Sequence, residues 1–181
     1  ETFLFTQCYA TGGGGGGGDG NGGSKAYKSC KVPLLVPLPS GIDVTSKTSS
    51  VRMYFAPPFA AALGAAISIM NSRGVVPKIT QGFRTYSDQV AMRNGGSGTN
   101  PAASPGNSLH ESGYAVDFRI TGQEQLSIMR SATEANGISW GGSFITDKPD
   151  PNHFYMNPFS TLAARQAANI AAAAYYHQCT Q

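Results

Sequence analysis

The residues best suited to chemistry in this sequence are two histidines and one aspartate between residues 108 and 154. The stretch SLHESGYAVDF, residues 108–118, contains His110 and Asp117, and DPNHF, residues 150–154, contains His153. The whole chain has only 3 histidines. A catalytic zinc ion typically takes three N or O ligands from the protein and leaves one position open for water. We therefore predict that these three side chains form one metal site.

The spacing of these residues requires a bend in the chain. His110 and Asp117 are an odd number of residues apart, so an uninterrupted strand would place them on opposite faces. Gly113 lies between them and allows the chain to turn. His153 must then come from a neighbouring strand. The helical zinc motif HExxH is excluded, because Tyr114 stands where its second histidine would be.

A zinc-bound water needs a base, and the scissile carbonyl needs a positive group beside it. Asp150 precedes His153 in a turn that Pro151 holds extended, so its carboxylate can be presented next to the metal. Asp147 is the competing candidate for the base. Arg84, in QGFRTYSDQ, lies between a predicted strand and a predicted helix and can stabilise an oxyanion.

Each of these residues also has a purely structural interpretation. A single buried histidine is more often a hydrogen-bonded structural residue than a metal ligand. Asp117 could be a strand-end charge and Arg84 a salt-bridge partner. His177, on the alanine-rich tail, is expected to be a surface residue.

The motifs resemble those of a known group of zinc peptidases. SLHESGYAVDF is similar to the SxHxxGxAxD motif of zinc D-alanyl-D-alanine carboxypeptidases of the VanY and VanX type. That group includes phage L-alanyl-D-glutamate endolysins and shares its fold with Hedgehog signalling domains. Every fixed position of the motif matches, at Ser108, His110, Gly113, Ala115 and Asp117.

Two further segments follow in the family's order. QGFRTYSDQ resembles the family's GYRS…Q segment and places Arg84 and Gln89. WGGSFITDKPDPNHF resembles the WGG…D/E-x-x-HF segment and places Trp140, Asp150 and His153. The resemblance covers residues 81–154, and the segments on either side are also compatible with it.

The resemblance implies a role for each matching position. His110, Asp117 and His153 would bind zinc, Asp150 would act as general base, and Arg84 would stabilise the carbonyl oxygen. Ser108, Gln89 and Trp140 would contact the substrate or support the site. Many family members have Glu where this chain has Asp150.

The implied activity is hydrolysis of peptide bonds in peptidoglycan stem peptides. Both a D-Ala-D-Ala carboxypeptidase and an L-Ala-D-Glu endopeptidase remain open, and the WGG…HF segment slightly favours the latter. The alternative is a non-catalytic zinc-binding or structural module of a surface or virion assembly that keeps the fold.

The elements that must position the site are helices and short strands in mixed order. Apolar spacing, proline starts and glycine stops predict helices over residues 57–74, 85–95, 121–137 and 160–178. Strands are expected within residues 77–83, 114–120, 138–144 and 153–157. YAVDFRI alternates, so Ala115 and Asp117 share one face and leave room for an ion. We predict an α+β fold with a small antiparallel sheet flanked by helices, of the Hedgehog and D-Ala-D-Ala-peptidase type.

Composition favours an exported protein and excludes several partners. Charged residues make up 13% of the chain and the net charge is +3, too small and dispersed for nucleic-acid binding. No apolar run has membrane-spanning length. We expect a secreted product that acts in an extracellular, periplasmic or cell-wall setting.

The N-terminal segment differs from the rest of the chain. Residues 11–24 are dominated by glycine, which predicts a spacer, so residues 1–30 are assigned to an arm and 31–181 to a zinc peptidase domain. Cys8 and Cys30 bracket the tract and could close it as a disulfide, which would leave Cys179 free; three pairings are possible. The arm or a free cysteine could bind an assembly partner.

Overall fold

The fold is built on a five-stranded sheet. The computed structural model describes residues 30–95, 103–143 and 149–180. The strand order is β2 (Thr45–Ser46), β4 (Lys78–Gln81), β5 (Ala115–Phe118), β7 (His153–Tyr155) and β6 (Ser139–Trp140). A separate pair, β1 (Val36–Pro37) and β3 (Tyr54–Phe55), lies nearby. The α+β class is confirmed.

One edge of the sheet corrects the prediction that it is wholly antiparallel. Strands β4, β5, β7 and β6 pair antiparallel, but β2 pairs with β4 in parallel. The connection from β2 to β4 includes a helix, and a crossover of that kind is what parallel strands require. The prolines of residues 31–56 indicated extended structure there but not its direction.

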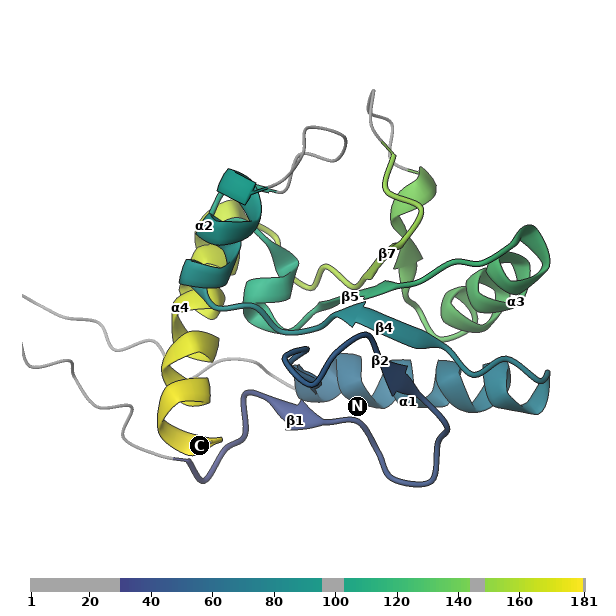
Figure 1. Cartoon of the computed structure of the whole chain (residues 1–181). Coiled ribbons are helices and arrows are strands. Elements are labelled where there is room, and N and C mark those ends of the chain that lie inside the picture. Colours follow the sequence, from purple (N-terminus) through teal and green to yellow (C-terminus); the bar gives the residue numbers. More distant parts are fainter. Residues whose placement is uncertain (1–29, 96–102, 144–148, 181) are drawn as a thin grey trace, which may run out of the picture.

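Within the described residues, four helices lie around the sheet. They are α1 (Pro57–Ser72), α2 (Tyr86–Gly95), α3 (Gln123–Glu134) and α4 (Leu162–Cys179), and all four predicted helices are confirmed with small shifts at their ends. Helix α1 begins with proline and is followed by Gly74 at φ 77°, the left-handed conformation that ends a helix. Figure 1 shows α1 on one side of the sheet and α2 rising from the other side. Among the described residues, no helix has both the length and the apolar character needed to cross a membrane.

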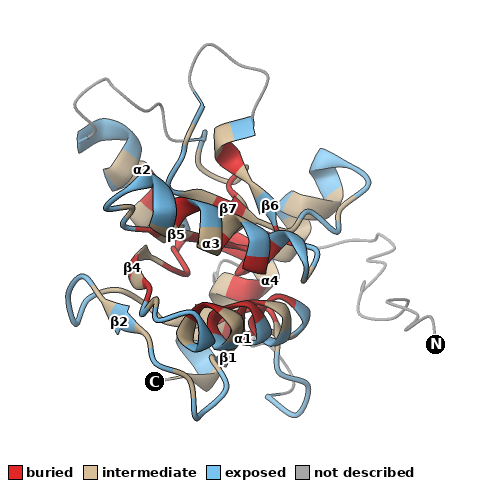
Figure 2. Ribbon diagram, turned by 90° about the vertical axis from the view of Figure 1, so that its right-hand side faces the viewer, coloured by how far each residue is buried: buried red, intermediate tan, exposed pale blue. Residues whose placement is uncertain are grey.

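The core lies between the sheet and helices α1 and α3. One cluster contains Phe59, Leu63, Ile67 and Met70 of α1, Val116 and Phe118 of β5, and Phe154 of β7. Each such side chain contributes about 1.5–3 kcal/mol when fully buried. Figure 2 shows this buried layer between α1 and the strands. Because Val116 and Phe118 face the core, Asp117 must face the other side of the sheet.

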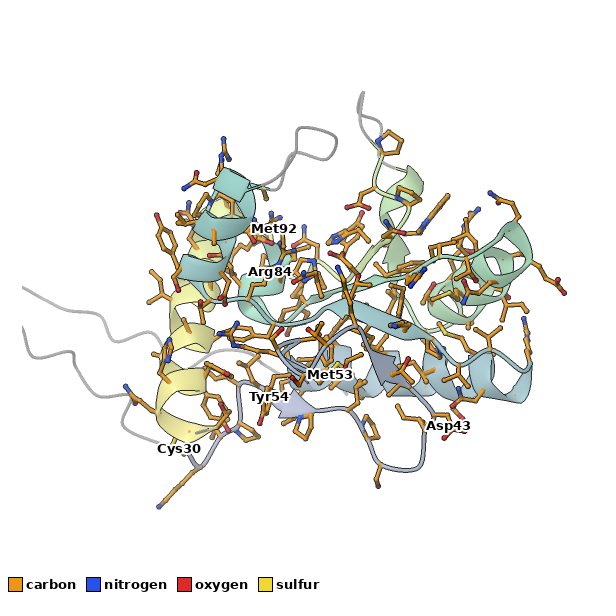
Figure 3. All side chains as sticks on the ribbon, viewed as in Figure 1. Cys30, Asp43, Met53, Tyr54, Arg84 and Met92 are labelled. Carbon is orange, nitrogen blue, oxygen red and sulfur yellow. A yellow bond between two sulfur atoms is a disulfide. The ribbon has the colours of Figure 1, made fainter. Side chains whose placement is uncertain are left out.

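A disulfide joins the two ends of the described chain. Cys30 bonds to Cys179 at the end of α4, with their Cα atoms 5.6 Å apart. Figure 3 shows Cys30 beside the C-terminal end of this helix. The suggested Cys8–Cys30 pairing is therefore wrong, because Cys30 is already bonded. Spacing along the sequence pointed to the nearer cysteine, whereas the fold brings the distant one close. Residues 1–29 of the predicted arm, which was assigned to residues 1–30, and Asp147 lie outside the described residues.

Candidate metal centre

The three predicted ligands meet on the open face of the sheet. Asp117 and His153 are register partners in the β5–β7 ladder, and His153 Nδ1 lies 2.9 Å from Asp117 Oδ1. His110 Nε2 lies 3.2 Å from the same oxygen and 3.3 Å from His153 Nδ1. The ligand atoms of this group all lie within 4.8 Å of one another, as a shared metal ion requires.

His110 reaches the site because the chain bends before β5, as predicted. It lies in the short 3-10 helix η1 (Leu109–Ser112), which ends at Gly113 with φ 78°. A Cβ at Gly113 would also lie 2.7 Å from the backbone nitrogen of Ala56, so the bend and the close packing both require glycine.

A reciprocal cap fixes the start of η1. The Ser108 hydroxyl accepts from His110 N, and Glu111 accepts from the backbone N–H groups of Ser108 and Gly106. Ser108 and Glu111 are both buried. This cap sets the position of the His110 backbone, so the contacts of Ser108 favour the supporting role over substrate contact.

A backbone carbonyl selects the His110 tautomer. His110 Nδ1 lies 2.8 Å from Gly82 O, and a carbonyl can only accept, so Nδ1 carries the proton. Nε2 therefore has its lone pair available and faces Asp117. A metal-binding histidine is commonly oriented in this way by a carbonyl on its other nitrogen.

The donor set fits a divalent cation of the zinc type. The Nε2 lone pair of His110, the Asp117 carboxylate and His153 Nδ1 converge on one point. A single proton can bridge only one pair of these atoms, whereas one cation can satisfy all three. Two imidazoles and a carboxylate suit zinc in particular.

Burial shifts the titration of the ligands. Burial lowers the pKa of His110 to about 4, and the positive charge of Arg84 acts in the same direction. Burial alone would raise the pKa of Asp117, but His110 and His153 hold the pKa of this carboxyl well below its usual range. At neutral pH the site therefore offers a neutral His110 and an ionised Asp117, the forms that bind metal.

Arg84 lies beside the ligands at the end of β4, next to α2 (Figure 3). Its Nη2 lies 3.9 Å from Asp117 Oδ2, and its backbone N–H donates to His110 O. The guanidinium is buried, and among the described residues its Nε has no hydrogen-bond partner. An oriented cation is thus held beside Asp117.

Asp150 lies in the turn that leads into β7. Its Oδ1 accepts from Asn152 N, and its backbone O accepts from His153 N. Burial raises the pKa of Asp150, and the negative charge of Asp117 raises it further. Arg84 and His153 act on the pKa of Asp150 in the opposite direction.

The two remaining predicted residues support neighbouring loops. Gln89 is completely buried, and its Nε2 donates to Ala103 O. Trp140 Nε1 donates to Pro151 O, and its ring packs against the Arg130 guanidinium, 4.1 Å away. Trp140 therefore holds the turn that carries Asp150.

Glycines whose contribution the sequence analysis did not identify complete the site. A Cβ at Gly82 would lie 2.1 Å from Arg52 O, and a Cβ at Gly141 would lie 2.8 Å from Asp150 O and 3.0 Å from His153 Cβ. Gly82 also provides the carbonyl that orients His110. Their positions in QGFR and WGGS were the available signal, but a glycine in a sequence does not reveal which backbone passes beside it.

Solved structures with the same arrangement of elements are peptidases. The LdcB LD-carboxypeptidase aligns with a TM-score of 0.56 at 15% identity, over 80% of this chain and 78% of its own. The vancomycin resistance D,D-dipeptidase VanXYg, in complex with a D-Ala-D-Ala phosphinate analog, aligns with a TM-score of 0.53 at 17% identity, over 81% and 64%. VanYB in complex with D-alanine-D-alanine aligns with a TM-score of 0.50 at 20% identity, over 78% and 87%. No family model and no curated protein matches the sequence.

At sequence identities of 15%, 17% and 20%, the similarity to these solved structures establishes the fold alone. The chain has the fold of the VanY and VanX type of peptidase, as the motifs indicated. The ligand group lies on the open sheet face of that fold.

Proposed function

We propose that this protein is a zinc-dependent peptidase that hydrolyses peptide bonds in peptidoglycan stem peptides. The observation that carries the proposal is the convergence of His110, Asp117 and His153 with Arg84 and Asp150 beside them. The shared fold with peptidases supports it. We also propose that it acts at the cell wall, outside the cytoplasm, where the Cys30–Cys179 disulfide is stable.

His110, Asp117 and His153 would hold the ion. Zinc, when bound, supplies a Lewis acid that polarises the scissile carbonyl and lowers the pKa of a water molecule. The contact between His110 Nδ1 and Gly82 O keeps His110 Nε2 aimed at the ion.

Asp150 would move the proton. Its carboxylate takes a proton from the attacking water as the oxygen bonds to the carbonyl carbon. It returns this proton to the nitrogen of the departing amine when the C–N bond breaks. The raised pKa of Asp150 suits this exchange, because a more basic carboxylate accepts the proton more readily.

Arg84 would stabilise charge on the substrate. Its guanidinium is held next to Asp117, with Nη2 3.9 Å from Oδ2. It can donate to the carbonyl oxygen as negative charge develops there.

Digestion of purified wall fragments tests the proposal. The zinc-loaded full chain should release new amino groups, and a chelator should stop the release. Mass spectrometry of the fragments identifies the bond: loss of terminal D-Ala marks a carboxypeptidase, and cleavage after L-Ala marks an endopeptidase. If a preparation with one zinc per chain releases nothing, the proposal fails and a non-catalytic binding module takes its place.

A further inference from the structure

A second polar feature lies on the open face of the sheet beside the metal site. It is a hollow of about 350 Å³ whose lining includes three cationic residues, Lys47, Lys78 and Arg119; Thr80, Asn152, Phe118 and Ile120 complete the lining. None of these residues has a role in the hydrolysis described above.

The sheet places the three cations side by side. Lys47 follows β2, Lys78 begins β4 and Arg119 follows β5, and these three strands are neighbours in the sheet. Lys47 N donates to Ile79 O, and Arg119 N donates to Lys78 O, so the three backbones are in contact. The cations therefore come from consecutive strands.

Within the described residues, no ion pair neutralises the positive charge of the hollow. In the part of the chain that the structure describes, Lys47, Lys78 and Arg119 form no ion pair, and no carboxylate lines the hollow. Three like charges in one concave surface attract an anion, and they favour binding of one that fills the space between them.

Residues that line the hollow are close neighbours of the candidate metal ligands. Arg119 is two positions beyond Asp117, so both side chains lie on the same face of the chain. The Thr80 hydroxyl donates to Asp117 O at 3.1 Å, and Asn152 precedes the ligand His153. A peptide whose scissile bond lies at the metal can therefore have a neighbouring residue near the three cations.

We propose that this hollow binds a carboxylate of the peptide substrate that is not part of the scissile bond. The inference rests on the proposed function, because a stem peptide carries such a carboxylate on its glutamate. A phosphate-rich wall polymer fits less well, since its binding needs a long track of cations, whereas this hollow has only three.

Two matched peptides test the inference. One is a stem peptide with its internal carboxylates free, and the other has those carboxylates as amides; the C-terminus is the same in both. The zinc-loaded full chain should favour the free form by about tenfold or more in kcat/KM, mainly through KM, because charged hydrogen bonds are the stronger ones. Added salt should reduce the preference.

A triple variant, with Lys47→Gln, Lys78→Gln and Arg119→Gln, should bring the two kcat/KM values together. Arg119→Gln alone should reduce the preference in part. The control is Arg73→Gln, which removes one exposed positive charge at the end of α1 and should leave the preference as in the unsubstituted protein. A preference that survives in the triple variant overturns the inference.

A binding measurement separates this inference from the proposed hydrolysis. Calorimetry with the same two peptides reports affinity whether or not the bond is cleaved. Tighter binding of the peptide with free carboxylates, without cleavage, supports carboxylate binding in the hollow and refutes the proposed hydrolysis. Cleavage of both peptides at equal kcat/KM supports the proposed hydrolysis and refutes carboxylate binding in the hollow. If poly(glycerol phosphate) binds through the three cations while amidation has no effect, the hollow serves a wall polymer and the inference is wrong.

Discussion

Asp117 and His153 face each other across the β5–β7 ladder, with His153 Nδ1 2.9 Å from Asp117 Oδ1. Directly opposed residues of antiparallel strands share a face and stay in register as long as the sheet is intact. Two of the three ligands are thus fixed by the sheet itself. The third, His110, is fixed by a 3-10 helix and a carbonyl. The site is therefore preorganised by backbone geometry.

Replacing a ligand should abolish tight metal binding. We expect His153→Ala to weaken zinc affinity by about 100-fold or more, because even residues that only orient a ligand cost 10–100-fold. His177→Ala is the matched control, since His177 is exposed on α4. Competition with a chromophoric chelator measures the zinc affinity of both variants. Equal affinity in the two variants would show that the ion binds elsewhere.

Asp150→Asn should retain zinc and lose activity. An amide cannot accept the proton from water, so kcat should fall by about 10²–10⁴-fold, the usual contribution of a general base. The measurements are metal content and the rate of amine release from wall fragments. Asp43→Asn, on the exposed surface, is the control. Unchanged activity in the Asp150 variant would transfer the role of base to Asp147.

The metal-free protein should lose stability as pH falls. The pKa of His110 is about 4 in the folded protein, below its ordinary value of 6.5, so the unfolded chain binds the proton more tightly. Stability should therefore drop between about pH 6.5 and 4, by up to about 3 kcal/mol. The lowered pKa of Asp117 adds a further loss at lower pH.

Urea titrations of metal-free protein from pH 7 to pH 4 measure this slope. His110→Gln should flatten the dependence of stability on pH between pH 6.5 and 4. His177→Ala should leave this dependence unchanged. A slope that is the same in all three proteins would mean that His110 protonates as easily when folded as when unfolded.

Gly82→Ala should damage both stability and metal binding. The added Cβ would lie 2.1 Å from Arg52 O, so the strand end must move, at a cost of a few kcal/mol. The same movement displaces the carbonyl that orients His110, so zinc affinity should also fall. Gly122→Ala is the control, because nothing lies within 4 Å of its Cβ position. Thermal melts and chelator competition report the two effects.

Loss of the disulfide should destabilise the domain. Cys179→Ser removes the disulfide between Cys30 and Cys179, which are 149 positions apart. This should lower the free energy of unfolding by about 2–5 kcal/mol. Reductant should have the same effect on the unsubstituted protein. Cys8→Ser should have none, because Cys30 is bonded to Cys179. Equal melting temperatures for the Cys8 and Cys179 variants would contradict this pairing.

Helix α4 also connects the Cys30–Cys179 disulfide to the metal site. Asn169 donates to Gly106 O, and Arg165 donates to Asn107 O, immediately before the cap of η1. The Cys179→Ser variant should therefore also show weaker zinc binding than the Cys8→Ser variant.

The sequence alone predicted the candidate ligand set, the α+β class and the four helices of the described residues. Residue type and spacing are sufficient for these, because local periodicity specifies helices and the chemistry of zinc limits the ligands. The bend at Gly113 also followed from spacing, since His110 and Asp117 cannot otherwise share a face. Sequence reasoning also named Arg84 and Asp150; the structure places the Arg84 guanidinium 3.9 Å from Asp117, and the backbone O of Asp150 accepts from His153 N.

Only the tertiary structure decided which distant segments touch. The parallel edge strand β2, the Cys30–Cys179 bond, the contact of Gly82 O with His110 and the hollow of three cations all join residues far apart in the chain. Such contacts depend on how the whole chain packs around one core. No local pattern of residue types carries that information.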